Sequence, residues 1–182
     1  MMQKRELKKN IKKMCMKEVL KNGLCLKNIS NQTEEMCISA IKQNWFAILY
    51  VKKKTYKICK LAVKLNGLSL YTFSNVKFSN NYEIHSKKMN TLYIIAVKQN
   101  GYALEFIEDQ TDEICRLAII DDSFSLQFVK NQTDELCRLA VEKDGSALQF
   151  VKNQTEEICV LAIKNNIRAM KYIKLKIDKL KN

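Results

Sequence analysis

The feature that most constrains this chain is a repeat of 22 residues. The phrase KNQTDELC ends at Cys137, and KNQTEEIC ends one period later at Cys159. An internal period of this length is typical of architectures that stack one small structural unit many times. The whole chain can be aligned on this period. The anchor residues of the repeats are Cys15, Cys37, Cys59, Tyr93, Cys115, Cys137 and Cys159.

The period is interrupted once. Tyr93 follows Cys59 by one period plus 12 residues, which places an insertion near 76–87. Apart from this insertion the register holds for seven repeats. We therefore predict a single helical-repeat domain over 1–182, with a Lys-rich cap at 174–182.

Every repeat contains the signal of a helix end, and four repeats also contain that of a helix start, at Thr33, Thr111, Thr133 and Thr155. Thr133 and its equivalents precede two acidic residues, a pattern typical of an N-cap and first turn, although the Asn of NQT could cap instead. Seven residues after every anchor stands Asn or Asp. Glycine follows it in four repeats, and these residue types tolerate left-handed backbone, so the helix should end there. The glycines are Gly23, Gly67, Gly101 and Gly145.

The second half of the repeat predicts another, shorter helix. Helical spacing brings Ala147, Leu148, Phe150 and Val151 to one side, whereas strand alternation would group Gln149 with apolar residues. The absence of proline and the low glycine content also favour helices. We predict an all-α solenoid of about seven two-helix repeats. The alternative is an α/β solenoid of leucine-rich-repeat type, because LQFVKN resembles that core, although Thr155 stands where a leucine belongs.

The repeat NQTEEICxLAIKxNGxALQFVK resembles a tandem repeat of unknown function. This repeat is common in proteins of giant amoeba-infecting viruses of the mimivirus kind, and looser relatives occur in bacteria. The resemblance is closest over 92–172 and weaker over 14–73. It implies a helical repeat and a viral protein made in host cytoplasm, and it implies no activity and no catalytic residues. The insertion and the basic ends depart from the family pattern.

The cysteines and the one histidine predict no catalytic, cofactor or metal site. Cysteines 22 residues apart lack CxxC-type spacing and would lie too far apart for disulfides, so we expect small buried side chains, Cys25 included. His85 lacks an accompanying nucleophile motif and is expected in a surface loop. The glycosylation-like NQT triplets are interpreted as helix starts. We predict that the protein is not an enzyme.

The net charge of +13 is unevenly distributed. Residues 1–92 carry 19 basic and 5 acidic residues, 93–160 carry 6 and 13, and 161–182 carry 7 and 1. No apolar run could cross a membrane and no secretion signal is evident, which predicts an intracellular protein, in host cytoplasm or virion if viral. Such basic ends attract nucleic acid or an acidic partner.

Lysines recur at one position, five residues after the anchor, as in Lys98 and Lys164, and cluster around Lys53 between Tyr50 and Tyr56. Basic and aromatic residues together can bind phosphates and stack bases. The first hypothesis is nevertheless a non-enzymatic scaffold that binds an unknown protein. Nucleic-acid binding by the basic N-terminal half is the alternative, and charge-driven self-association is a second alternative. The candidate anion or nucleic-acid contacts are Lys42, Lys52, Lys53, Lys54, Lys57, Lys60 and Lys64.

Overall fold

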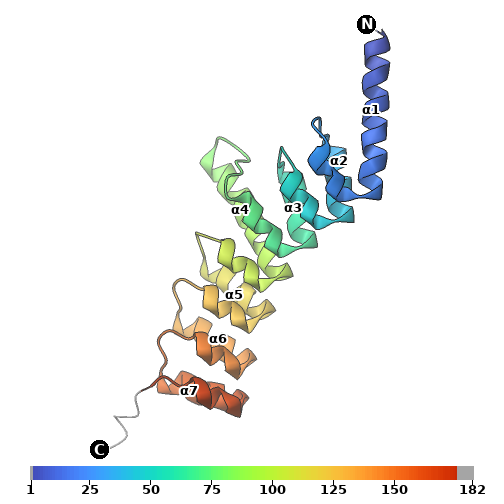
Figure 1. The fold of residues 1–182 in the computed structure, drawn as a ribbon. Helices are drawn as coiled ribbons and strands as arrows, with labels where there is room; N and C mark the ends of the chain where they lie inside the picture. The colour runs from blue at the N-terminus through green and yellow to red at the C-terminus, as the bar shows by residue number, and fades with distance from the viewer. Residues whose placement is uncertain (1, 176–182) are drawn as a thin grey trace, which may run out of the picture. The chain divides into compact units, whose positions relative to one another are not determined.

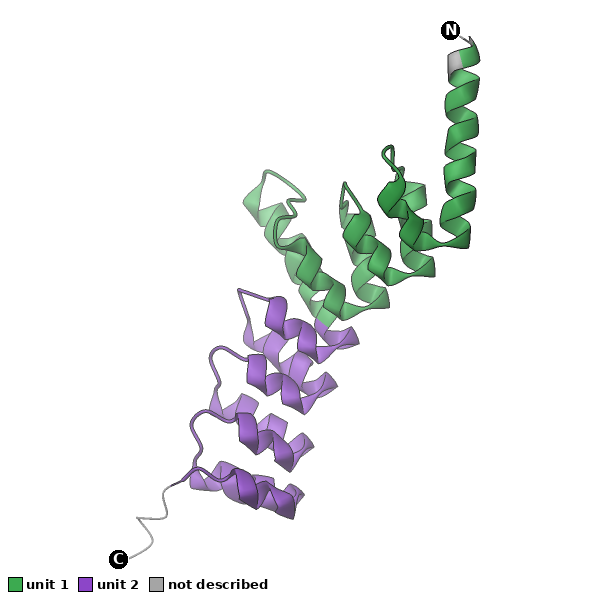
Figure 2. Cartoon of the chain, in the orientation of Figure 1, with its two compact units in different colours: residues 1–96 green, residues 97–182 purple. Residues whose placement is uncertain are grey.

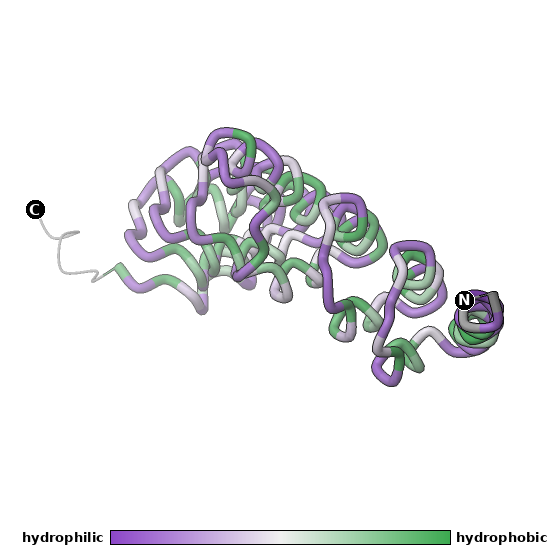
Figure 3. The backbone as a smooth tube through the Cα atoms, turned by 90° about the horizontal axis from the view of Figure 1, so that it is seen from above, coloured by the Kyte–Doolittle hydropathy of each residue, from purple (hydrophilic) through white to green (hydrophobic). Residues whose placement is uncertain are grey.

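The structure, a computed structural model, describes residues 2–175, so the predicted cap at 174–182 lies almost entirely outside the described residues. Within 2–175 the chain forms helices and no strand. The all-α prediction is therefore confirmed, and the α/β alternative is not supported. Figure 3 shows hydrophobic segments recurring in the repeats between hydrophilic loops.

Each repeat pairs an α-helix with a shorter 3-10 helix, so the second helix predicted from the sequence is present in the tighter form. The elements are α1 (Met2–Lys21), η1 (Gly23–Asn28), α2 (Glu34–Gln43), η2 (Trp45–Tyr50), α3 (Tyr56–Leu65), η3 (Gly67–Phe73), α4 (Tyr82–Gln99), η4 (Gly101–Phe106), α5 (Asp112–Asp121), η5 (Ser123–Phe128), α6 (Asp134–Lys143), η6 (Gly145–Phe150), α7 (Glu156–Asn165) and η7 (Ile167–Tyr172) (Figure 1).

The chain divides into two compact units, unit 1 over 1–96 and unit 2 over 97–182 (Figure 2). The predicted single domain is thus divided within α4. Inside each unit, consecutive α-helices pack side by side as one layer, and consecutive 3-10 helices pack as a second layer. We call these two surfaces the α side and the 3-10 side of the unit.

The core lies between these two layers. In α2 the buried residues are Met36, Cys37, Ala40 and Ile41, a spacing that gathers them on one face of the helix. The 3-10 helices contribute small and branched residues, such as Ala147 and Leu148 of η6. Phe150 differs from the expectation, because it is only half-buried while Ala147, Leu148 and Val151 are fully buried. Its ring lies 5.4 Å from that of Phe124, in the preceding 3-10 helix.

The helix-start prediction is confirmed. Thr33, Thr111, Thr133 and Thr155 are the N-caps, and each hydroxyl accepts a hydrogen bond at 3.3 Å from the N–H three residues later. Thr55 caps α3 in the same way at 3.4 Å. The Asn of NQT is not the cap.

The helix ends are placed as predicted, but the expected left-handed backbone is wrong. No residue in the described part of the chain has a positive φ. The Asn or Asp instead caps the 3-10 helix, as Asn22 does by accepting a 3.0 Å bond from the N–H of Leu24. Glycine is required by a close approach, since a Cβ on Gly145 would lie 2.2 Å from the carbonyl oxygen of Ala162 in the next α-helix.

The insertion is part loop and part helix. The chain from 74 to 81 has no regular helix, and the following residues extend the N-terminal end of α4. His85 therefore lies on α4 and half-buried, and its predicted place in a surface loop is wrong. Its Nδ1 accepts a 3.4 Å hydrogen bond from the N–H of Phe78, whose ring packs edge-on against Tyr56 with centroids 5.5 Å apart. These contacts hold the insertion against α3.

The glutamine of the NQT phrase joins consecutive repeats, which the sequence had not indicated. The Gln132 amide nitrogen donates to the carbonyls of Leu126 in η5 and Phe150 in η6, both at 3.0 Å. Its oxygen accepts from the N–H of Lys152 at 2.9 Å and from the Cys137 thiol at 3.7 Å. One side chain thus satisfies polar groups at the ends of two neighbouring 3-10 helices. We call this arrangement the glutamine clamp.

The same clamp recurs wherever the glutamine is present. Gln32, Gln110 and Gln154 each bind a carbonyl six residues earlier, a carbonyl 18 residues later and an N–H 20 residues later. Each also accepts from the thiol of the anchor cysteine five residues later. Lysine replaces this glutamine at two positions, Lys54 and Lys88, which flank the insertion.

A second contact between repeats lies at the C-terminal ends of the α-helices. The Asn165 oxygen accepts from the N–H of Gly145 at 2.8 Å, and its nitrogen donates to the carbonyl of Glu142 at 2.7 Å. Asp121 likewise accepts from the N–H of Gly101 at 2.7 Å. The side chains of Asn165 and Asp121 therefore satisfy the first N–H of a 3-10 helix, at the glycine where the next α-helix approaches closely.

We predict that Gln132→Ala lowers the free energy of unfolding by roughly 2 kcal/mol, because it leaves several partly buried carbonyl and N–H groups without partners. The matched control is Gln149→Ala, which makes the same chemical change but removes only a local bond to the carbonyl of Ser146. The control should cost less than about 0.5 kcal/mol. Urea unfolding followed by circular dichroism measures both, and equal losses would contradict the clamp.

Candidate functional site

The anchor cysteines are structural thiols. Cys37, Cys59, Cys115, Cys137 and Cys159 are buried and free, as predicted, whereas Cys15 and Cys25 are half-buried. Burial raises the pKa of Cys59 to about 12 and that of Cys115 and Cys137 to about 11. A thiol with a pKa this high stays protonated at neutral pH and is a poor nucleophile. The anchor thiol is a small packing group, and in the four repeats that have the clamp glutamine it also donates to that glutamine.

No metal-binding group of three His, Cys, Asp or Glu residues occurs in the described part of the chain. Over the same residues, no helix is both long enough and apolar enough to cross a membrane.

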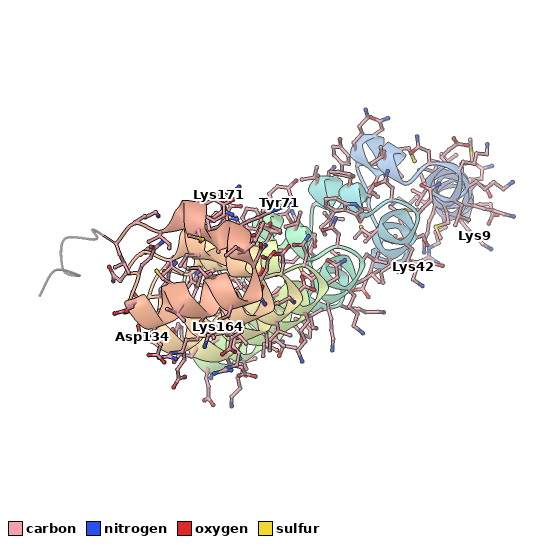
Figure 4. The ribbon with its side chains drawn as sticks, turned by 90° about the horizontal axis from the view of Figure 1, so that it is seen from below. Lys9, Lys42, Tyr71, Asp134, Lys164 and Lys171 are labelled. Carbon is pink, nitrogen blue, oxygen red and sulfur yellow. The ribbon has the colours of Figure 1, made fainter. Side chains whose placement is uncertain are left out.

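The lysines predicted as anion contacts do not form one surface. Lys42 and Lys64 are exposed in the last turns of α2 and α3, about 15 Å, the length of a ten-residue helix, from the loops that precede these helices. Figure 4 labels Lys42 on its helix. Lys57 forms an ion pair with Glu34 at 3.1 Å, and the ammonium of Lys60 lies 5.9 Å from the Tyr56 ring centroid. Four of the seven predicted residues are thus dispersed or already engaged.

The row of lysines five residues after the anchor is also interrupted. In unit 2 this position is occupied by Lys98, Ile120, Glu142 and Lys164. The two lysines are exposed, but they stand at the ends of the row, and Ile120 and Glu142 separate them. The row therefore offers no continuous basic edge in this unit.

Lys52 has a structural role that its repeat equivalents share. Its ammonium donates to the carbonyl of Ser30 at 3.2 Å, 22 residues earlier. Lys130 donates to the carbonyl of Glu108 at 2.8 Å and Lys152 to that of Lys130 at 3.0 Å, across the same interval. This lysine is a third contact between repeats.

Lys52, Lys53 and Lys54 do come together, around a cavity of about 420 Å³ in unit 1. The opposite wall is the chain that leaves η3 and enters the insertion. Lys77 on that wall is a fourth basic residue, which the sequence reasoning missed although its position beside the insertion was visible. The full lining is Lys52, Lys53, Lys54, Thr72, Ser74, Asn75, Val76 and Lys77.

The α side of unit 2 carries ion pairs between repeats. Arg116 of α5 pairs with Glu135 of α6 at 3.7 Å, and Arg138 of α6 pairs with Glu157 of α7. The bond to Arg138 lowers the pKa of the Glu157 carboxyl. All four side chains are substantially exposed, so these pairs contribute little stability. On this side the charges of the paired arginines and glutamates neutralise each other.

The 3-10 side carries aromatic and apolar side chains. In unit 1 we define the aromatic patch as Phe46, Leu49, Tyr50 and Tyr71, whose exposed fractions are 47%, 42%, 37% and 42%. In unit 2 rings of neighbouring repeats meet edge to face: Tyr102 with Phe128 at 5.5 Å, and Phe124 with Phe150. We call these four rings the aromatic row; each is half-buried. In Figure 4, Lys171 of η7 and Lys164 of α7 mark the two different sides of unit 2.

We predict that the melting temperature falls as pH rises from about 9 toward 11, partly because of the buried thiols. The unfolded chain releases thiol protons near the ordinary pKa of 9.0, while folded Cys115 and Cys137 keep theirs until about 11. Proton release therefore favours the unfolded state across this window. Thermal melts should show a smaller fall for Cys115→Ala/Cys137→Ala than for the native sequence. An identical fall in both proteins would contradict the raised pKa values.

Comparisons with models of protein families, with curated proteins and with solved structures find no match to this chain. The resemblance to the giant-virus repeats therefore stays a prediction, and the function must be inferred from the surfaces themselves.

Proposed function

We propose that this protein is a non-enzymatic helical-repeat scaffold that binds another protein through the 3-10 side of its repeats. The observation that carries this proposal is the set of partly exposed aromatic side chains on that side. Stacked repeats present extended surfaces of this kind, in which neighbouring repeats contribute equivalent positions.

The aromatic patch has the composition of a protein-binding surface. Aromatic residues are enriched in the centres of protein interfaces and account for much of their binding energy. On a 3-10 helix, residues three apart eclipse one another, so Phe46 and Leu49 project in the same direction. Tyr71 occupies the position of Leu49 in the next repeat. These side chains are thus large apolar groups at repeated positions of two consecutive 3-10 helices, and folding leaves each of them partly exposed.

The α side is less suited to this role. In unit 2 its arginines and glutamates already pair with each other, so a partner would have to displace these bonds to use the charges. The aromatic row of the same unit keeps half-exposed ring surface available without breaking any polar contact. The contrast between the two sides supports the 3-10 side as the binding surface.

The other two hypotheses stay predictions. Nucleic-acid binding was based on seven lysines. Four of them are dispersed or engaged by Glu34 or Tyr56, and the other three line the cavity of unit 1. Charge-driven self-association was based on the basic and acidic segments of the sequence. The aromatic patch favours neither of them.

The proposal predicts specific capture of a protein partner that depends on the patch. Immobilised native protein and Phe46→Ser/Tyr71→Ser should be compared in quantitative capture from host-cell lysate at high salt, where charge-driven contacts are screened. Partner recovery should fall at least about tenfold with the variant, as expected for loss of a binding hot spot.

The matched control is Leu20→Ser/Ile120→Ser, which removes two exposed apolar side chains, 61% and 52% accessible, from the α-helices. Both stand five residues after an anchor. The control should retain the partner. Equal recovery by all three proteins, or an equal loss with the control, would contradict binding through the 3-10 side.

A further inference from the structure

The basic cavity of unit 1 lies where the repeat is interrupted. In other repeats the 3-10 helix ends after six residues, as η5 and η6 do. Here η3 has seven residues, and the chain continues through the insertion before α4 begins. The connection beyond η3 forms one wall, and the loop that carries Lys52–Lys54 forms the other. The cavity is therefore a local departure from the repeat.

The positive charge in this cavity is not neutralised by the protein. The lining includes four lysines and no carboxylate. The ion pairs of the described residues involve none of these four, although Lys57 nearby does pair with Glu34. Carbonyl oxygens position two of the ammonium groups, that of Lys52 through Ser30 and that of Lys54 through Val51 at 3.4 Å. Carbonyls orient these groups and leave their charge in place.

Lys54 stands where four other repeats have the clamp glutamine. A lysine has three donors and no acceptor, so it cannot accept from the thiol of Cys59 as the glutamines accept from their anchor thiols. This loop therefore lacks the clamp, as the loop at Lys88 does, and has instead a half-buried cation whose ammonium donates to the carbonyl of Val51. Lys54 replaces a residue that joins consecutive repeats and does not restore that connection. Departures of this kind from a repeat pattern are expected at functional positions.

From this geometry we infer that the cavity binds an oligophosphate anion, such as a free or nucleotide-borne triphosphate. The site is a largely open depression of about 420 Å³, so an anion can reach the ammonium groups from solvent. Four ammonium groups match an anion with three or four negative charges, and lysine binds phosphate as a point charge. The hydroxyl of Ser74 and the amide of Asn75 add neutral donors for phosphoryl oxygens, whereas the hydroxyl of Thr72 already donates to the carbonyl of Ser69 at 3.0 Å.

This site is distinct from the protein-binding surface proposed above. It uses lysines of two loops, whereas the aromatic patch uses side chains of η2 and η3. Its variants leave Phe46 and Tyr71 unchanged, so the two proposals can fail separately.

The test is isothermal titration calorimetry of the full chain with inorganic tripolyphosphate at about 50 mM salt, where screening is weak. The native protein should bind one tripolyphosphate saturably. Lys54→Gln/Lys77→Gln should weaken binding at least about tenfold. The control Lys27→Gln/Lys42→Gln makes the same charge change at two exposed lysines of unit 1 outside the cavity, and it should weaken binding less than about twofold.

The cavity variant restores the glutamine of the other repeats at position 54, so it is expected to fold, and its circular dichroism melt checks this. Competition by a nucleoside triphosphate for the tripolyphosphate site would support the inference and would show that the site accepts a nucleotide-borne triphosphate. Absence of saturable binding, or equal weakening by the control, would overturn the inference. Binding of single-stranded RNA that tripolyphosphate does not displace would also overturn it, in favour of a nucleic-acid surface.

Discussion

The structure depends on how two short helices, too small to bury their own faces, are held to the next pair. The glutamine clamp supplies that connection with one side chain. Gln132 binds the carbonyls of Leu126 and Phe150 and the N–H of Lys152, at the ends of two neighbouring 3-10 helices. Backbone groups left unpaired in this partly buried position would oppose stacking. Hydrogen bonds of the clamp, as well as apolar contacts, therefore join one repeat to the next.

This connection explains why the period is kept so strictly. The clamp requires a carbonyl 18 residues ahead, an N–H 20 residues ahead and a thiol five residues ahead of the same glutamine. Adding or removing one residue between the glutamine and that carbonyl would displace at least the carbonyl and the N–H. Where the insertion breaks the period, the glutamine is absent on both sides of it, at Lys54 and Lys88. At Lys54 the loss of the clamp coincides with the basic cavity, and for this reason we assign the cavity a function and the clamp a structural role.

The sequence predicted the helix starts, the helix ends and the burial of the cysteines, because caps and apolar spacing act over a few residues. It missed the clamp, because the partners of Gln132 are close only after the repeats stack. It gave the wrong reason for the glycines: what matters at Gly145 is the carbonyl of Ala162 in the next helix, not the backbone angle. Likewise Lys77 joined the candidate site only through the path of the insertion, which no local signal specifies.

The clamp can be tested most directly by amide hydrogen exchange measured by NMR. The N–H groups of Lys130 and Lys152 lie in loops, outside any helix, but donate to clamp glutamines at 3.0 and 2.9 Å. They should exchange at least about a hundredfold more slowly than those of the next loop residues, Asn131 and Asn153, because opening them requires neighbouring repeats to separate. Exchange of Lys130 and Lys152 at the rate of Asn131 and Asn153 would contradict the account.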